Sequence, residues 1–305
     1  MTRTFGKKMS ILLRDIRASY DSHHFGASLK KGAITIWCSD SPTPITTVRP
    51  GFSGGQNRHF IDPVNRLIYS GTWEDGLTCF DYTDNRTVWH RSDLIGIQTV
   101  DLSAGFPNSL FVTLEAPDYG LDEPGVISGI VELAADDGRT KWTTEDGDWI
   151  YAAPKHPILV LQDRCDKMVR ILDAGRNEIG STPMVHFAIA DVAFSEQMIA
   201  LAEGEKGVRI LNNKGEVISQ YAPQGRKPNC IRVTFSGDRV IVFDSWEGSF
   251  VTTINPTTGE VVSEYQRQSH GTICFIDGGT RFVDPAGRVC RSIDGEIEAT
   301  LKAEQ

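Results

Sequence analysis

The chain has 305 residues, of which 40% are hydrophobic and 23% charged, a composition typical of a globular protein and unlike that of a disordered one. Forty acidic residues against 31 lysines and arginines give a net charge of −9, which argues against binding to the phosphates of double-stranded nucleic acid. No apolar run approaches the roughly 18 residues that span a bilayer, and the N-terminal apolar stretch is too short for a secretory signal. We therefore expect a cytoplasmic protein with no membrane partner.

Short apolar runs recur along the chain, and polar turns separate them, which is typical of many short antiparallel strands. Such turns occur at 81–89, 133–142, 172–180, 211–219, 254–263 and 292–300. Each turn carries a residue suited to the positive φ that a two-residue hairpin turn requires. These residues are Asn85, Gly138, Asn177, Gly215, Gly259 and Gly295, spaced by 53, 39, 38, 44 and 36 positions. A weaker unit precedes them at 34–48, with its turn near Pro42.

A second series of apolar runs, at 67–75, 110–118, 158–166, 198–206 and 240–248, repeats with the same period. A period of about 40 residues that contains only strands indicates the blades of a β-propeller. Seven such units fill the chain, so we predict an all-β, seven-bladed propeller with four antiparallel strands in each blade; six or eight blades are the alternatives. The predicted blades cover 1–49, 50–92, 93–146 with an insertion at 116–125, 147–183, 184–223, 224–266 and 267–305. Residues 1–32 supply either the first two strands of the first blade or a strand that completes the last one.

The turn sequences also carry a family resemblance. "LAADDGRTKW" (133–142) resembles the Leu-x-Ala-x-Asp-Gly-x-x-x-Trp repeat of quinoprotein-type propellers, and "DYTDNRTVW" (81–89) is a looser copy. The comparison with WD-repeat propellers is weaker because none of the six tryptophans is followed by Asp. The resemblance implies the propeller fold of the quinoprotein-like and WD-repeat-like superfamily. The adjacent cysteine pair and export signal that are common in quinoprotein dehydrogenases are missing, so we expect no cofactor.

The cysteines and histidines give no strong metal or catalytic signal. No pair of the six cysteines has the CxxC spacing of a zinc site, and five of the six lie in apolar runs, which indicates buried thiols. The pair His23 and His24, together with His186 and His270, could act as ligands, although isolated structural histidines are commoner. We find no nucleophile elbow, metalloprotease motif, phosphate loop or dinucleotide fingerprint in a strand-to-helix context.

In a propeller, the loops between second and third strands share one face with the connections between blades. Those loops contain twelve acidic residues and only three basic ones, so we predict an acidic face that also presents aromatic side chains. Exposed aromatics beside carboxylates suit the capture of a basic protein surface. The predicted partner-binding residues are Trp73, Glu74, Asp75, Asp118, Tyr119, Asp122, Glu123, Trp149, Asp244, Trp246 and Glu247.

These features favour a non-catalytic, protein-binding propeller over an enzyme. The role would be that of an adaptor, a scaffold or an inhibitor, for example a bacterial immunity protein that masks a basic toxin. One alternative is a small-molecule hydrolase or lyase, which would need two or three carboxylates around a divalent metal at the central channel. The other alternative is a glycan-binding propeller, since exposed tryptophans beside acids also suit sugars.

Overall fold

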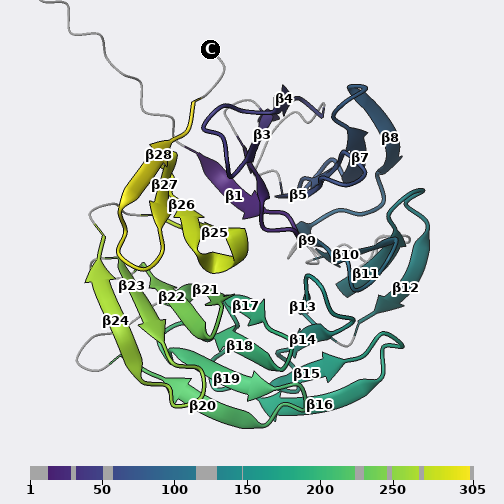
Figure 1. The fold of residues 1–305 in the computed structure, drawn as a ribbon. Coiled ribbons are helices and arrows are strands. Elements are labelled where there is room, and N and C mark those ends of the chain that lie inside the picture. Colours follow the sequence, from purple (N-terminus) through teal and green to yellow (C-terminus); the bar gives the residue numbers. More distant parts are fainter. Residues whose placement is uncertain are drawn as a thin grey trace, which may run out of the picture.

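The computed structural model describes residues 13–28, 32–50, 58–114, 129–145, 147–223, 230–245, 249–267 and 271–302. In these residues, 28 strands form seven four-stranded antiparallel sheets, and the sheets lie in a ring around a common axis (Figure 1). The predicted all-β, seven-bladed propeller is confirmed. Within the described ranges, no helix is long and apolar enough to cross a membrane.

The first three blades occupy the N-terminal half of the chain. The first contains β1 (Arg14–Ala18), β2 (His24–Ser28), β3 (Ile34–Cys38) and β4 (Thr46–Val48). The second contains β5 (Arg58–Asp62), β6 (Leu67–Gly71), β7 (Leu77–Asp81) and β8 (Arg86–Arg91). The third contains β9 (Ile97–Leu102), β10 (Ser109–Leu114), β11 (Gly129–Ala134) and β12 (Thr140–Thr144).

The other four blades follow in chain order. The fourth contains β13 (Trp149–Ala152), β14 (Leu159–Asp163), β15 (Met168–Leu172) and β16 (Glu178–Pro183). The fifth contains β17 (Asp191–Phe194), β18 (Met198–Ala202), β19 (Val208–Asn212) and β20 (Val217–Tyr221). The sixth contains β21 (Cys230–Ser236), β22 (Arg239–Asp244), β23 (Phe250–Ile254) and β24 (Val261–Gln266). The seventh contains β25 (Cys274–Ile276), the 3-10 helix η2 (Asp277–Gly279), β26 (Arg281–Val283), β27 (Arg288–Arg291) and β28 (Ile297–Thr300).

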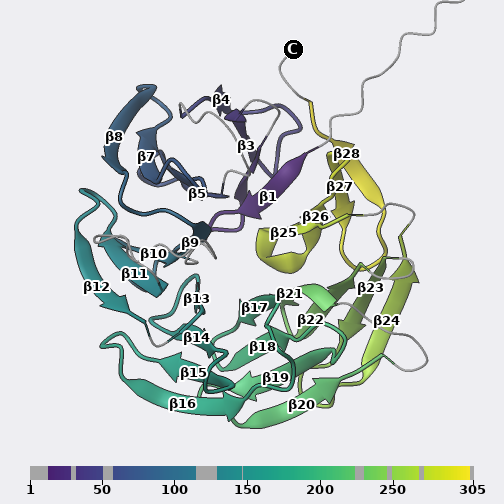
Figure 2. The ribbon, with the colours of Figure 1, turned by 180° about the vertical axis from the view of Figure 1, so that it is seen from behind.

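Each sheet is built from four strands that are consecutive in the chain, and the first strand of each blade lies nearest the axis (Figures 1 and 2). The N-terminal segment therefore supplies the first two strands of the first blade. Among the described residues, the first and last blades do not exchange a strand, so the ring closes through contacts between two complete sheets.

Burial explains why the apolar runs fall where they do. Every residue of β10 is buried, because neighbouring blades cover both faces of a second strand. The outermost strand β24 has one sheet neighbour and is exposed or only partly buried at every position. The buried side chains form seven clusters, one between each pair of neighbouring blades. The cluster that contains Phe25, Trp37, Cys274 and Val289 joins the first blade to the last.

The turns between third and fourth strands differ from the expected two-residue hairpins. In the sixth blade the pairing shifts by one residue between Thr253 and Ile254, and Gly259 donates its N–H to the carbonyl of Asn255 at 2.8 Å. The turn therefore contains a bulge, with Gly259 at φ +74°. Five of the six predicted turn residues have positive φ, but in the fourth blade Arg176 adopts it (φ +69°) instead of Asn177.

Candidate binding face

Because neighbouring strands are antiparallel, loops that follow second strands and connections that precede first strands emerge on the same side of the ring. We call this side the connection face; its described residues lie at 32–33, 49–50, 72–76, 92–96, 145, 147–148, 164–167, 184–190, 203–207, 222–223, 245, 249, 267, 271–273 and 284–287. The opposite face carries the turns between first and second strands and between third and fourth strands. The two views of Figures 1 and 2 look at the ring from its two sides.

The loop at 72–76 holds three of the predicted binding residues. Trp73 is 43% exposed, Glu74 is exposed and Asp75 is partly buried. The loop is fixed from below, since the buried Thr72 accepts the Asp75 N–H at 2.8 Å and donates its hydroxyl to the Asp75 carboxylate at 3.1 Å. Gly96 N–H binds the Trp73 carbonyl at 2.9 Å. The backbone is thus held in place while the indole and the Glu74 carboxylate face solvent.

Trp149 begins β13 and lies under an arginine. The Arg164 guanidinium carbon is 5.2 Å from the centre of the Trp149 ring, and its Nη2 lies 3.0 Å from Asp148 Oδ1. This stack covers part of the indole, so Trp149 contributes a mixed aromatic and cationic surface. The stack also places a positive charge on the connection face, which the sequence predicted to be acidic.

Asp244 does not contribute a surface carboxylate. It ends β22 and is 3% exposed, so its carboxylate is buried and does not face solvent. The other predicted binding residues lie outside the described residues. They are Asp118, Tyr119, Asp122, Glu123, Trp246 and Glu247.

Burial also reduces the negative charge expected of the connection face. Eight of the twelve acids in the loops that follow second strands are described, and four of these eight are buried; the four are Asp163, Glu203, Asp244 and Asp284. Arg209 on β19 donates to both carboxylate oxygens of Glu203 at 2.5 and 2.7 Å. Asp284 accepts from Arg288 Nε at 2.7 Å and from Arg267 Nη2 at 3.2 Å. Glu203 and Asp284 therefore join the ends of second strands to neighbouring strands, and arginines compensate their charge inside the protein.

The connection between the fourth and fifth blades presents apolar side chains that the sequence reading missed. Phe187 is 77% exposed and Val185 is 43% exposed. The segment is held at several points: Met184 N–H binds the Lys167 carbonyl at 2.9 Å, and Ile189 N–H binds Gln162 Oε1 at 2.7 Å. A large apolar ring is therefore displayed on an ordered loop.

The neighbouring histidine orients that ring. The His186 and Phe187 ring centres are 4.2 Å apart, and His186 Nδ1 lies 3.0 Å from the Ala188 carbonyl oxygen. His186 also lies over the next loop, where a Cβ on Gly204 would be 3.1 Å from its ring. The only sequence signal was an apolar run, "MVHFAIA" (184–190), at the position of a connection between blades.

Charged side chains from several blades meet at the axis of the ring. The main four are Arg17 on β1, Asp101 on β9, Asp191 on β17 and Arg232 on β21. Burial raises the pKa of Asp101 to about 6, and the nearby Arg17 only partly offsets this effect. Burial also raises the pKa of Asp191, although Arg232 and the Val233 N–H, at 2.9 Å, act in the opposite direction.

This axial group bears on the enzyme alternative. Two carboxylates and two guanidinium groups have no net charge, whereas a divalent cation needs a surplus of carboxylates. The described axial residues therefore suit a structural charge network better than a metal centre.

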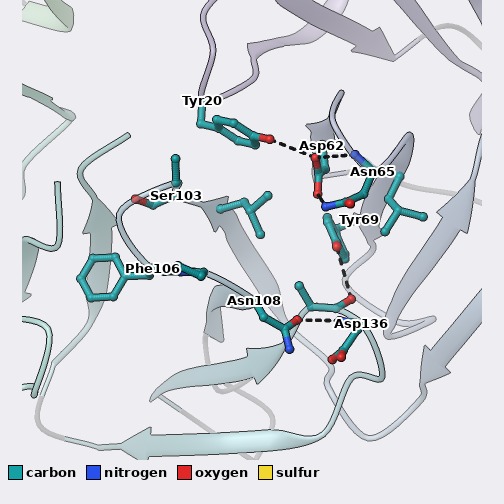
Figure 3. A pocket seen from close by; sticks show the side chains of 13 residues that line it. Tyr20, Asp62, Asn65, Tyr69, Ser103, Phe106, Asn108 and Asp136 are labelled. Carbon is teal, nitrogen blue, oxygen red and sulfur yellow. Dashed lines mark hydrogen bonds between the residues drawn. The ribbon is translucent and has the colours of Figure 1, made fainter. Parts of the chain in front are cut away.

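A pocket of about 690 Å³ opens on the opposite face, between the second and third blades (Figure 3). Its polar groups largely bind one another. Asp62 accepts hydrogen bonds from the Tyr20 hydroxyl at 3.1 Å and from Asn65 Nδ2 at 2.7 Å. Asn108 Oδ1 accepts the Asp136 N–H at 3.0 Å. The pocket has the size of a ligand site, but the polar groups in these bonds already have partners within the protein.

Comparison with solved structures supports the β-propeller fold. Hsv2 from Kluyvelomyces marxianus matches over 96% of this chain and 100% of its own, with a TM-score of 0.74 and 10% identity. The β-propeller domain of Cps50 (Swd1) from Myceliophteria thermophila matches over 92% and 93%, with a TM-score of 0.70 and 12% identity. U3-55K matches over 90% and 88%, with a TM-score of 0.67 and 10% identity. No family model and no curated protein matches the sequence.

Proposed function

We propose that this chain is a non-catalytic propeller that binds another protein through its connection face. The observation that carries the proposal is the display of Trp73 and Phe187 on that face, each mostly or substantially exposed and each on a loop fixed by backbone hydrogen bonds. Interfaces concentrate their binding energy in a few aromatic side chains, and an ordered loop loses little conformational entropy on binding. WD40-type propellers typically act as scaffolds or adaptors, which agrees with this role.

The charge of the partner follows from the surroundings of Trp73. Glu74 and Asp75 directly follow Trp73 in its loop, and an arginine at the base of this loop, Arg58, is paired with Asp15. A basic patch on the partner would approach this side of the ring, and the Phe187 side would accept an apolar contact. The roles of adaptor, scaffold and inhibitor differ only in what the bound protein does. We place this binding in the cytoplasm.

The test begins with capture of partners from the native host by full-length protein and their identification by mass spectrometry. The variant Trp73→Ala/Phe187→Ala should lower affinity for a specific partner by about 30-fold or more, the ~2 kcal/mol of a hot-spot residue. Val64→Ala is the matched control, because Val64 is 74% exposed in a turn of the opposite face. Equal capture by the double variant and the wild type would show that the partner binds elsewhere.

Salt dependence tests the charge of the interface separately. Glu74→Lys should slow association with a basic partner, and the difference from the wild type should shrink as ionic strength rises. If the association rate at low salt were unchanged in Glu74→Lys, the partner would bind through the aromatic contact without attraction by the Glu74 charge. Retention of sugars by the wild type, lost in Trp73→Ala, would instead support the glycan-binding alternative.

A further inference from the structure

We propose that His23, Cys38 and Asp40 form a binding site for Zn²⁺ or a similar transition-metal ion. We call these three residues the seam site, because they lie in the first blade where it meets the last. His23 directly precedes β2, Cys38 ends β3 and Asp40 lies in the turn after β3. Strand pairing brings them together: His24 is the register partner of Cys38, and Ser39 N–H binds the His23 carbonyl at 2.9 Å.

The donor atoms have the spacing that a metal ion requires. His23 Nε2 is 3.2 Å from Cys38 Sγ and 3.2 Å from Asp40 Oδ2, and all three donor atoms lie within 4.8 Å of one another. Zinc bonds of about 2.0–2.3 Å in tetrahedral geometry place neighbouring ligand atoms about 3.4–3.6 Å apart. The distances from His23 Nε2 to Cys38 Sγ and to Asp40 Oδ2 are within a few tenths of an ångström of this spacing, and the Cys38 and Asp40 donors lie within 4.8 Å of each other. Among the described residues, no other group of three His, Cys, Asp or Glu side chains brings its donor atoms this close together.

The histidine is already oriented for coordination through Nε2. Its other ring nitrogen, Nδ1, lies 3.1 Å from Asp277 Oδ1 and 2.7 Å from Ser39 Oγ. Arg281 Nη2 holds the second oxygen of Asp277 at 2.6 Å. Metal-binding histidines usually donate their remaining N–H to a carboxylate in this way, which fixes the ring and makes the ligating nitrogen more basic.

Charge and ligand type favour a transition metal over calcium or magnesium. A thiolate and a carboxylate balance a divalent ion, and the imidazole adds a neutral donor. Sulfur and imidazole nitrogen suit zinc, whereas calcium and magnesium prefer sites made only of oxygen. The side chains of His23 and Asp40 are 41% and 72% exposed, so an ion can enter from solvent and keep a water molecule as its fourth ligand.

The position of the seam site suggests its effect. No described strand is shared across the seam, and hydrogen bonds there join loops: Asp277 N–H to the Ser22 carbonyl at 2.6 Å, and Lys302 N–H to the Pro42 carbonyl at 2.7 Å. Asp277 belongs to the last blade and contacts a ligand in the first. A bound ion would tighten this link and stabilise the closed ring, because a ligand that binds only the folded state raises its stability.

The experiment uses untagged, reduced, full-length protein and Co²⁺ as a spectroscopic probe, followed by competition with Zn²⁺. One equivalent of Co²⁺ should give a sulfur-to-cobalt charge-transfer band, and Zn²⁺ should displace it and raise the melting temperature. Cys38→Ser should abolish the band and lower Zn²⁺ affinity by about 100-fold or more, while Cys165→Ser should behave as the wild type. Cys165 is the matched control because it is an exposed cysteine on the connection face.

Asp40→Asn provides a second variant in case Cys38→Ser folds poorly, since the exposed Asp40 side chain can be replaced without disturbing the core. It should fold normally and lose about tenfold or more in Zn²⁺ affinity. The proposal is overturned if Co²⁺ gives no thiolate band, if Cys165→Ser removes the band, or if Ca²⁺ raises the melting temperature as much as Zn²⁺ does.

Discussion

At the scale of single residues, the axial Asp101 makes stability depend on pH. Burial raises the pKa of its carboxyl from the ordinary 3.8 to about 6, so the folded protein binds a proton that the unfolded chain has already released between these values. The free energy of unfolding should therefore fall as the pH rises from about 4 to about 6. Two pKa units correspond to at most about 3 kcal/mol, and solvent near the axis reduces this.

Urea denaturation at pH 4.5, 6 and 7.5 tests this expectation on the wild type and Asp101→Asn. The variant cannot ionise at this position, so its stability relative to the wild type should increase across the series, by about 1–3 kcal/mol in total. Val64→Ala, at an exposed side chain that does not ionise, should keep a constant difference from the wild type at every pH. A constant difference between Asp101→Asn and the wild type would contradict the raised pKa.

The residue scale is also where the sequence predicts least. Glu74 is exposed and Asp244 is buried, yet each comes after an apolar run and directly follows an aromatic residue. The sequence pattern alone does not distinguish the two acids. Whether a carboxylate is buried depends on partners that another strand supplies, and the local sequence does not show them. Glu203 is an example, because its partner Arg209 comes from β19. Phe187 shows the converse case. Its apolar sequence neighbours are typical of a buried strand, but its side chain is exposed.

At the scale of elements, the buried ion pair between Glu203 and Arg209 should be essential to the hairpin of β18 and β19. Their side chains are 1% and 6% exposed, and Arg209 Nη1 also donates to Thr182 Oγ1 at 3.2 Å. Arg209→Met would leave a buried carboxylate without its counter-charge, which costs about 3–5 kcal/mol. Chemical denaturation should show this loss, and Glu203→Gln/Arg209→Met should recover part of it.

Arg291→Met is the matched control for that measurement. Arg291 also pairs with two acids, Asp294 and Glu296, but its side chain is 43% exposed and theirs are 45% and 64% exposed. An exposed pair of this kind contributes little to stability, because water screens the two charges. Equal losses in Arg209→Met and Arg291→Met would show that burial does not govern the stability of these pairs.

The sequence predicts elements far better than residues, because element positions follow from a repeated pattern. Unbroken apolar runs marked second strands, which are covered on both sides, and β10 and β14 are buried at every position. Turn residues were located correctly at Gly215 and Gly259, but the bulge in each turn was not predicted. A bulge adds one residue to one strand and leaves the apolar pattern on both sides unchanged.

At the scale of the whole molecule, the period of about 40 residues was enough to predict a ring of seven blades. It did not reveal how the ring closes, because a first strand and an additional last strand have similar patterns. It also says little about the partner, since one propeller fold serves many functions and binding depends on particular loops. Fold neighbours at 10–12% identity share the architecture with this chain.

The mode of closure leads to a prediction about circular permutation. Near the two ends of the described chain, Leu13 N–H binds the Pro285 carbonyl and Leu301 N–H binds the Gly287 carbonyl, both at 2.8 Å. The ends therefore lie beside the same loop, and a short Gly-Ser linker can join them at a small entropic cost. Opening the chain instead between residues 224 and 229, at the connection between the fifth and sixth blades, leaves all seven sheets intact.

This permutant should fold and melt within about 4 °C of the wild type, a difference of about 1–2 kcal/mol. A second permutant, opened at 72–76, breaks the hairpin of β6 and β7 inside one sheet and should melt at a clearly lower temperature. Thermal denaturation followed by circular dichroism compares the two. If both permutants lost the same stability, intact blades would not be the units that hold the ring together, and closure would depend on the order of the blades along the chain.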